Sequence, residues 1–340
     1  MKNKKNKYLV SLLLIFLIVS LFYTFSLAQT TILHIACVHP KTHILNRTCT
    51  TFSELLDEKT DGKLKVMVHC AGELGNERDC VEMMQAGTLD ASLVNTVVYD
   101  AFSEALTPLS FPFLLPDKET AMSFVKDVIE PNRFQKLEQE TGIVPLSIYS
   151  CGWRYIYSKE PVSSIEDLKG GKKRVMETPY HIEAMKALGI NPVPLPWGEV
   201  YTALQLGTVD LAGNEVATYV QTKFYEVAPY FVNTKHTHTF ELLGFSKKIM
   251  DTFDPETQKK IKEAAQEATS YWWERLEEYE EESFEALRNL KGFGETVQLV
   301  ELSDKERTEM RGMVLPVLLE NFSDKLGEDA LKWLEENNLR

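Results

Sequence analysis

The spacing of hydrophobic and polar residues changes several times along the chain, and each change marks a predicted element. Residues 32–38 form a short apolar run typical of a buried strand. Between positions 44 and 56, apolar residues recur at helical spacing, and Gly62 ends that segment. Residues 64–69 then alternate as a strand does, and a helix is predicted from about Asn76 to Gly87. This order predicts an α/β fold with a mostly parallel sheet.

A six-residue motif occurs twice and suggests two similar halves. The sequence QAGTLD at 85–90 recurs as QLGTVD at 205–210, which places Gly87 and Gly207 120 residues apart. Each copy follows a predicted helix, and a glycine at the helix end supplies the left-handed turn that other residues resist. Ligands of open α/β sheets bind beyond the carboxyl ends of the strands. Asn95 and Asn214 follow shortly after the two copies, and we therefore expect them to lie where two lobes meet over a ligand.

A long helix rich in Glu and Lys is predicted from Asp254 to about Leu290. Asp254 followed by Pro255 is typical of a capped helix start. Trp272 and Trp273 lie within this helix, and buried aromatic side chains of this kind mostly serve packing.

The first 28 residues have the pattern of a secretory signal peptide. Four lysines precede an apolar run, and Ser26-Leu27-Ala28 offers the small residues of a cleavage site. The run is also close to the length of a minimal membrane span, so a retained anchor is the alternative. We expect a periplasmic or otherwise extracytoplasmic protein of about 312 residues, which suggests two domains. Loss of the four lysines takes the net charge from −13 to −17, which disfavours nucleic acid as a partner.

The five cysteines are too scattered for a disulfide scaffold, and no C-x-x-C motif is present to hold zinc. Export makes one bridge between Cys70 and Cys80 possible, and free, buried thiols are the alternative.

Two arginines indicate a carboxylate site. Arg154 lies in the sequence GWRY, and Arg174 closes the sequence LKGGKKR. The planar guanidinium pairs with both oxygens of a carboxylate, which a lysine ammonium does not do. His39 and His43 flank the first loop, and loops carry function disproportionately, so they are candidates to line the same cleft.

Motifs of catalysis and cofactor binding are missing from the sequence. It contains no G-x-S-x-G, P-loop or G-x-G-x-x-G motif, so we expect no enzyme and no cofactor. His236 and His238 with Glu241 are a weak metal candidate, because zinc needs three or four ligands. We expect no metal.

Several segments together resemble the substrate-binding subunits of tripartite ATP-independent periplasmic (TRAP) transporters, of the dicarboxylate-binding-protein type. In order and spacing, the resemblance covers nearly the whole chain after residue 32. The segments are GELGNER at 72–78, FPFL at 111–114, IEDLKG at 165–170, WGEVYTALQ at 197–205 and GTVD at 207–210.

The resemblance implies a two-lobed periplasmic-binding-protein fold with two mixed sheets, hinge strands and a long helix spanning both lobes. The first lobe is expected to hold residues 29–151 and about 240–280, and the second 152–239 and about 281–340. It also implies a monomer that closes on a small organic carboxylate and delivers it to the membrane permease subunits of a TRAP transporter. A sensor module that binds the same ligand for a membrane kinase is the alternative.

The resemblance assigns roles to individual residues. Arg174 grips the ligand carboxylate, Arg154 supports it, and Trp197 lies against the ligand. Asn214 is a ligand partner in the second lobe. The first lobe contributes Asn95, with Asn76 and the His39 loop.

The chain departs from the family pattern at two places. The sequence DLAGNE at 210–215 stands where the family has DGQENP, and Met176-Glu177 follow Arg174-Val175 where the family often has Pro-Asn. A carboxylate at Glu177 would pair with Arg174 or face a ligand hydroxyl or amine. We therefore expect a sugar acid or a similar polyhydroxy or amino acid rather than a plain dicarboxylate.

Overall fold

The computed structural model describes residues 30–339, so the predicted signal peptide at 1–28 lies outside the described residues. The strands are β1 (Thr31–Cys37), β2 (Leu64–His69), β3 (Ala91–Asn95), β4 (Ile143–Ser158), β5 (Lys172–Val175), β6 (Asn191–Pro194), β7 (Leu211–Asn214), β8 (Tyr230–Ser246) and β9 (Gln298–Val300). The α-helices are α2 (Ile44–Lys59), α3 (Glu77–Ala86), α4 (Lys118–Phe124), α5 (Glu130–Thr141), α6 (Pro179–Ala187), α7 (Val200–Leu206), α8 (Val216–Gln221), α9 (Lys247–Met250), α10 (Pro255–Arg288), α11 (Asp304–Leu326) and α12 (Glu328–Glu336). The predicted α/β fold is confirmed.

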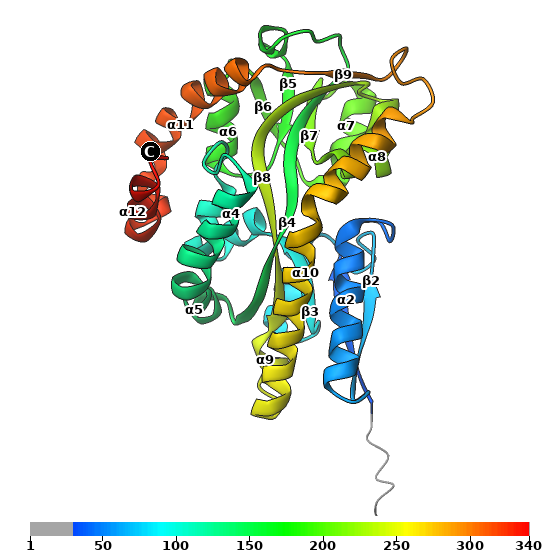
Figure 1. Ribbon diagram of the computed structural model, residues 1–340, viewed down its shortest axis with the longest axis vertical. Helices are drawn as coiled ribbons and strands as arrows, with labels where there is room; N and C mark the ends of the chain where they lie inside the picture. The colour runs from blue at the N-terminus through cyan, green and yellow to red at the C-terminus, as the bar shows by residue number, and fades with distance from the viewer. Residues whose placement is uncertain (1–29, 340) are drawn as a thin grey trace, which may run out of the picture.

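The strands form one mixed sheet in the order β2-β1-β3-β8-β4-β7-β5-β6, with β9 paired to β8. β1 pairs in parallel with β2 and β3, and β5 pairs in parallel with β6 and β7. Between these two groups, β4 and β8 run antiparallel to each other from Ile143 beside Ser246 to Ser158 beside Tyr230. Two separate sheets were expected. Instead, the long hinge strands β4 and β8 are paired along most of their length and join both halves into one sheet (Figure 1).

The pairing of β4 with β8 is interrupted by register shifts on both sides of Arg154. One shift lies between Ser150 and Gly152, and another between Arg154 and Ile156. Gly152 has φ +87°, a left-handed conformation that a residue with a Cβ resists. Bulges of this kind increase strand twist and redirect side chains, so they set the direction in which Arg154 leaves the strand.

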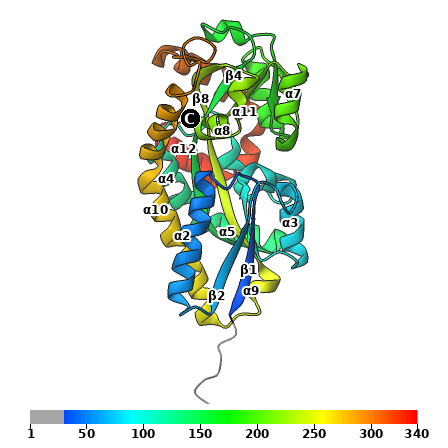
Figure 2. The ribbon, with the colours of Figure 1, turned by 90° about the vertical axis from the view of Figure 1, so that its right-hand side faces the viewer.

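Helix α10 connects the two halves, as expected for the long helix predicted from about Asp254 to Leu290. It packs on α2, on β4 and on α8, and Figure 2 shows it running beside both the lower and the upper half. Asp254 caps it by accepting hydrogen bonds from the backbone N–H groups of Glu256 and Thr257, each at 3.0 Å. Trp272 and Trp273 donate their indole N–H groups to backbone carbonyls of β4, so both serve packing.

The C-terminal helices pass from one half to the other. α11 packs on α6, whereas α12 lies against the π-helical turn η3 (Val125–Ile129), where Trp333 meets Phe124 edge to face. Arg133 of α5 also pairs with Asp329 of α12. The C-terminal residues assigned to the second lobe therefore contact the first, and the lobe limits stay a prediction.

The two predicted glycine turns both form. Gly87 ends α3 with φ +80° and Gly207 ends α7 with φ +75°. The strands that follow, β3 and β7, end at Asn95 and Asn214.

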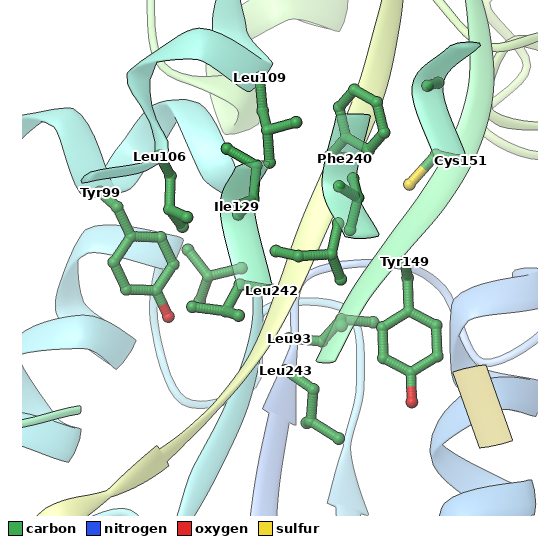
Figure 3. Close-up of a cluster of buried hydrophobic side chains, with 14 of the residues drawn as sticks. Leu93, Tyr99, Leu106, Leu109, Ile129, Tyr149, Cys151, Phe240, Leu242 and Leu243 are labelled. Carbon is green, nitrogen blue, oxygen red and sulfur yellow. The ribbon is translucent and has the colours of Figure 1, made fainter. Parts of the chain in front are cut away.

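Buried side chains fill both halves. Leu93, Leu242 and Leu243, from β3 and β8, and Tyr149 of β4 belong to the core of the first half (Figure 3). A second cluster surrounds the rings of Tyr155, Tyr157, Tyr219, Phe224 and Phe231. Across residues 30–339, no helix is both long and apolar enough to span a membrane.

All five cysteines are unpaired, and the Cys70 thiol donates to the Asn46 side-chain oxygen at 3.3 Å. The bridge considered between Cys70 and Cys80 is thus not formed, and the alternative of free thiols holds.

Candidate ligand-binding site

Arg154 is buried on β4 and held by groups at the end of β7. Its Nη2 donates to the Gly213 carbonyl and to the Asn214 side-chain oxygen, and its Nη1 lies 3.4 Å from Glu215 Oε1. Asn214 and Glu215 are themselves buried. The sequence predicted Arg154 and Asn214 as separate ligand partners, and the structure brings them into direct contact.

Arg174 is buried on β5, where its Nε donates to the Leu195 carbonyl at 2.9 Å. Within residues 30–339, its two terminal nitrogens have no hydrogen-bond or ion-pair partner, so they are available to an anion. Burial and the nearby Arg154 lower the pKa of Arg174 to about 10, while Tyr157 and Glu77 oppose that change. The guanidinium therefore stays charged at neutral pH.

Two stacked histidines occupy the loop after β1. The rings of His39 and His43 lie 4.2 Å apart, and His39 Nε2 is 2.6 Å from Glu241 Oε1. Burial opposes protonation of His39, but Glu241 outweighs it and raises the His39 pKa. For His43, burial and the neighbouring His39 lower the pKa well below its usual value. Of the two stacked rings, His39 therefore takes up a proton more readily than His43.

The first and second halves touch at this point. His43 Nε2 lies 3.2 Å from the Thr218 hydroxyl of α8, and His43 also caps α2 by accepting from the Leu45 N–H. Thr218 in turn donates to Glu215, the partner of Arg154. The contact joins the histidine pair to the arginine side of the cleft.

Glu77 is an acidic group on the first-half side that sequence reasoning missed. Its Oε1 accepts a hydrogen bond from the Asn95 N–H at 2.7 Å. Burial and the charge of Glu241 raise the Glu77 pKa to about 7, although Asn95, His39 and Arg174 act against that rise. Its position directly after Asn76, at the start of α3, was the only sequence signal for it.

The remaining predicted residues have different surroundings. Asn95 and Asn76 both accept backbone hydrogen bonds as helix caps, Asn95 from the Val97 N–H and Asn76 from the Asp79 N–H. Trp197 is half-buried and meets Phe224 edge to face. Glu177 is exposed in the turn after β5, and its negative charge opposes part of the lowering of the Arg174 pKa.

The histidines considered as a metal pair have separate partners. His236 Nδ1 lies 2.8 Å from the Thr234 hydroxyl, and His238 bonds the Ser150 hydroxyl and stacks on Phe240. In the part of the chain that the structure describes, no group of three or more His, Cys, Asp or Glu side chains is arranged to hold a metal.

A surface cavity of about 230 Å³ lies elsewhere, between β8 and α10. Its lining holds four acids, Glu277, Glu280, Glu281 and Glu301, against two basic residues, Lys235 and Arg288. This excess of carboxylates does not suit an organic anion, so we locate the candidate site at Arg174 rather than in this cavity.

The chain matches the family described as "Bacterial extracellular solute-binding protein, family 7" over residues 35–325. It is 31% identical over 297 residues to a solute-binding protein of Sulfitobacter sp. NAS-14.1, covering 87% of this chain and 88% of that protein. It is also 32% identical over 221 residues to the 2,3-diketo-L-gulonate-binding periplasmic protein YiaO of Escherichia coli, with 65% and 67% covered.

Two solved structures are similar in fold. The sugar acid binding protein DctPAm of Advenella mimigardefordensis, in complex with galactonate, has a TM-score of 0.84 and 25% identity, covering 92% of this chain and 99% of that one. A TRAP periplasmic solute binding protein of Sulfitobacter sp. NAS-14.1 with bound β-D-galacturonate has a TM-score of 0.77 and 26% identity, covering 87% and 97%.

Proposed function

This chain belongs to family 7 of the bacterial extracellular solute-binding proteins, and on that premise we propose that it captures a sugar acid between its lobes. The ligand class is a small organic carboxylate with several hydroxyl groups. The family is one of solute-binding proteins, and the similar structure from Sulfitobacter is a TRAP periplasmic solute binding protein, which favours delivery to a TRAP permease over a sensory role. We further propose that the chain is exported through cleavage of residues 1–28, acts as a monomer and catalyses no reaction.

The unpartnered terminal nitrogens of the buried Arg174 guanidinium support this proposal most directly. A charged group in a desolvated place is stable only with a counter-ion, and a ligand carboxylate matches the two-pronged guanidinium. Arg154 is already held by Gly213, Asn214 and Glu215, so in this proposal it orients the end of β7 and Arg174 binds the carboxylate.

Groups on the opposite side suit hydroxyls. Glu77 and Glu241 are acceptors, and His39 Nδ1, which is buried without a partner in the described chain, offers one further ring nitrogen. Ligand contacts to both lobes favour the closed state because only that state makes both sets at once. Trp197, half-buried in the short turn before α7, offers an aromatic surface to the carbon chain of the ligand.

The test is a thermal-shift screen of organic acids followed by calorimetry. An aldonate or hexuronate should bind, and Arg174→Ala should weaken it by ~2–5 kcal/mol, since a desolvated ion pair is lost. Arg174→Lys should also be costly, because the two-pronged geometry is lost. The matched control is Arg288→Ala, an exposed arginine of α10 that pairs with Glu281.

Unchanged affinity in Arg174→Ala would refute the role of Arg174. Tight binding of succinate without binding of any sugar acid would refute the ligand class.

A further inference from the structure

His43 and Thr218 form a direct hydrogen bond between the two halves of the molecule. His43 stands at the start of helix α2, after strand β1, and Thr218 lies in helix α8, after strand β7. His43 Nε2 is 3.2 Å from the Thr218 hydroxyl oxygen, and both side chains are buried. The strands β1 and β7 belong to opposite halves of the sheet, so this hydrogen bond crosses from one half to the other.

The capping of α2 fixes the direction of this hydrogen bond. His43 Nδ1 accepts from the Leu45 N–H at 3.3 Å. Burial and the neighbouring His39 lower the His43 pKa well below its usual value, so the ring is neutral and carries a single proton. Because Nδ1 is the acceptor, that proton is on Nε2, and His43 donates to the Thr218 oxygen. Both ring nitrogens of His43 are thus occupied within the chain.

The hydrogen bonding continues from Thr218 to the buried arginine of β4. The Thr218 hydroxyl donates to Glu215 Oε2 at 3.1 Å, and Glu215 Oε1 lies 3.4 Å from Arg154 Nη1. A threonine hydroxyl has one proton and two lone pairs, so Thr218 accepts from His43 while it donates to Glu215. We call this series of four side chains, His43, Thr218, Glu215 and Arg154, the His43–Arg154 relay.

Opening of the two halves would break the relay between His43 and Thr218. The hydrogen bond from Thr218 to Glu215 lies within the segment that follows β7 and would move with the second half. In an open state, water reaches the separated groups. In the closed state they are buried, and a buried donor without an acceptor is costly, so the closed state depends on the Thr218 oxygen.

We propose that the His43–Thr218 hydrogen bond forms when the halves close on the ligand, so that both residues tighten binding as positioning residues. This rests on the proposed function, in which closure brings the ligand contacts of both lobes together. Through Glu215, the same closure holds Arg154 and the end of β7, the strand beside the one that carries Arg174. Ligand affinity then includes a hydrogen bond that the ligand itself does not make.

Two substitutions at Thr218 separate the hydroxyl from the size of the side chain. Thr218→Val removes the hydroxyl at nearly constant shape, and Thr218→Ser keeps the hydroxyl. Calorimetry with galactonate and with galacturonate should give about fivefold or more weaker binding for Thr218→Val, because the buried His43 N–H loses its acceptor in the closed state. Thr218→Ser should stay within about threefold of the wild type. Thr222→Val is the matched control, because the Thr222 hydroxyl donates to the Thr218 backbone carbonyl within α8.

His43→Asn tests the other partner of the hydrogen bond. Asparagine is a preferred N-cap residue, so it keeps the cap of α2, whereas its shorter side chain does not reach Thr218. His43→Asn should also weaken binding. Adding Thr218→Val to it should weaken binding by less than about twofold more, because both changes remove the same hydrogen bond. Losses that multiply in the double variant would overturn the proposal.

The rates of binding distinguish a closure contact from a merely structural one. Because the hydrogen bond forms after the ligand has entered, Thr218→Val should raise the dissociation rate and leave the association rate within about twofold of the wild type. Stopped-flow fluorescence measures both rates.

The outcomes keep this inference apart from the proposed function. If the wild type binds a sugar acid and Thr218→Val binds it equally well, the inference is overturned and the proposed function stands, even where the ligand-free variant is less stable. Equal weakening in Thr218→Ser and Thr218→Val also overturns the inference, because the hydroxyl is then not the cause. If the wild type binds no organic acid of the screen, the proposed function fails and the inference fails with it.

Discussion

The two buried arginines of the candidate site should respond differently to replacement, because within residues 30–339 Arg154 has an acid partner and Arg174 has none. In Arg154→Met, the Glu215 carboxylate stays buried and loses its cation, while the Gly213 carbonyl and the Asn214 oxygen lose a donor. In Arg174→Met, the protein loses one hydrogen bond, to the Leu195 carbonyl. The first change should therefore destabilise the ligand-free protein and the second should mainly affect binding.

The magnitude follows from the cost of an orphaned charge. Removing one partner of a buried ion pair costs about 3–5 kcal/mol. Relief of the repulsion between Arg154 and the cations Lys173 and Arg174 offsets part of that cost. We therefore expect the lower end, about 3 kcal/mol, which corresponds to a fall in Tm of roughly 6–12 °C for a chain of this size. For Arg174→Met, the single hydrogen bond and the same relief of repulsion leave a change of about 1 kcal/mol or less.

Urea denaturation of the ligand-free proteins measures both values. The double variant Arg154→Met/Glu215→Gln is the control, since it removes the stranded carboxylate and should recover at least about half of the lost stability. Equal losses for the two arginine variants would refute the reasoning, and so would a double variant no more stable than Arg154→Met.

Three further predictions concern other residues. In the folded state the Glu77 pKa is about 7, above its usual value of about 4.5. Between these two pH values the folded protein therefore binds more protons than the unfolded chain, so Glu77 lowers the free energy of unfolding as the pH rises from about 4.5 to 7. The Tm of Glu77→Gln relative to that of the wild type should thus increase from pH 5 to pH 8. A Tm difference that does not change with pH would contradict this. Thiol labelling of the native protein should modify Cys70 alone, because the other four cysteines are buried. The reaction of Cys70 should be slow, because partial burial raises its pKa, and all five thiols should react after unfolding. Asn76→Ala should lower the free energy of unfolding by about 0.5–2 kcal/mol through loss of the α3 cap, whereas Asn76→Asp should retain the cap. If Asn76→Ala is as stable as the wild type but binds the ligand more weakly, Asn76 is a ligand-binding residue instead.

Local signals predicted the parts of this fold that depend on local chemistry. The QAGTLD and QLGTVD motifs predicted two helix-to-strand turns because a left-handed residue after a helix needs glycine, and both turns form. Asp254-Pro255 predicted the start of α10 for a similar reason, since a cap and a fixed φ act within one turn.

Contacts between distant segments were out of reach of such signals. His39 was predicted to lie at the cleft, but its partner Glu241 is 202 residues away and was considered only as a companion of His236 and His238. Periodicity tells which side chains share a face of one strand, not which strand lies opposite. Lys173 shows the same limit, because it is buried, and the elements that pack on or pair with β5, namely α6, β6 and β7, all come later in the chain.

The charges around the proposed site favour a sugar acid over a plain acid as its ligand. The chain carries a net charge of −13, so an anion is attracted only where cations gather, which here is the second-half side with Arg174. The first-half side presents Glu77 and Glu241, which repel a carboxylate but accept hydrogen bonds from hydroxyls. A short apolar dicarboxylate would offer no donor to Glu241 Oε2, which is buried and has no hydrogen-bond partner within residues 30–339, and an unsatisfied group of this kind costs about 1–3 kcal/mol. In the proposed complex, a polyhydroxylated chain supplies donors, so the closure that would pair its carboxylate with Arg174 would also provide hydrogen bonds to the acids opposite.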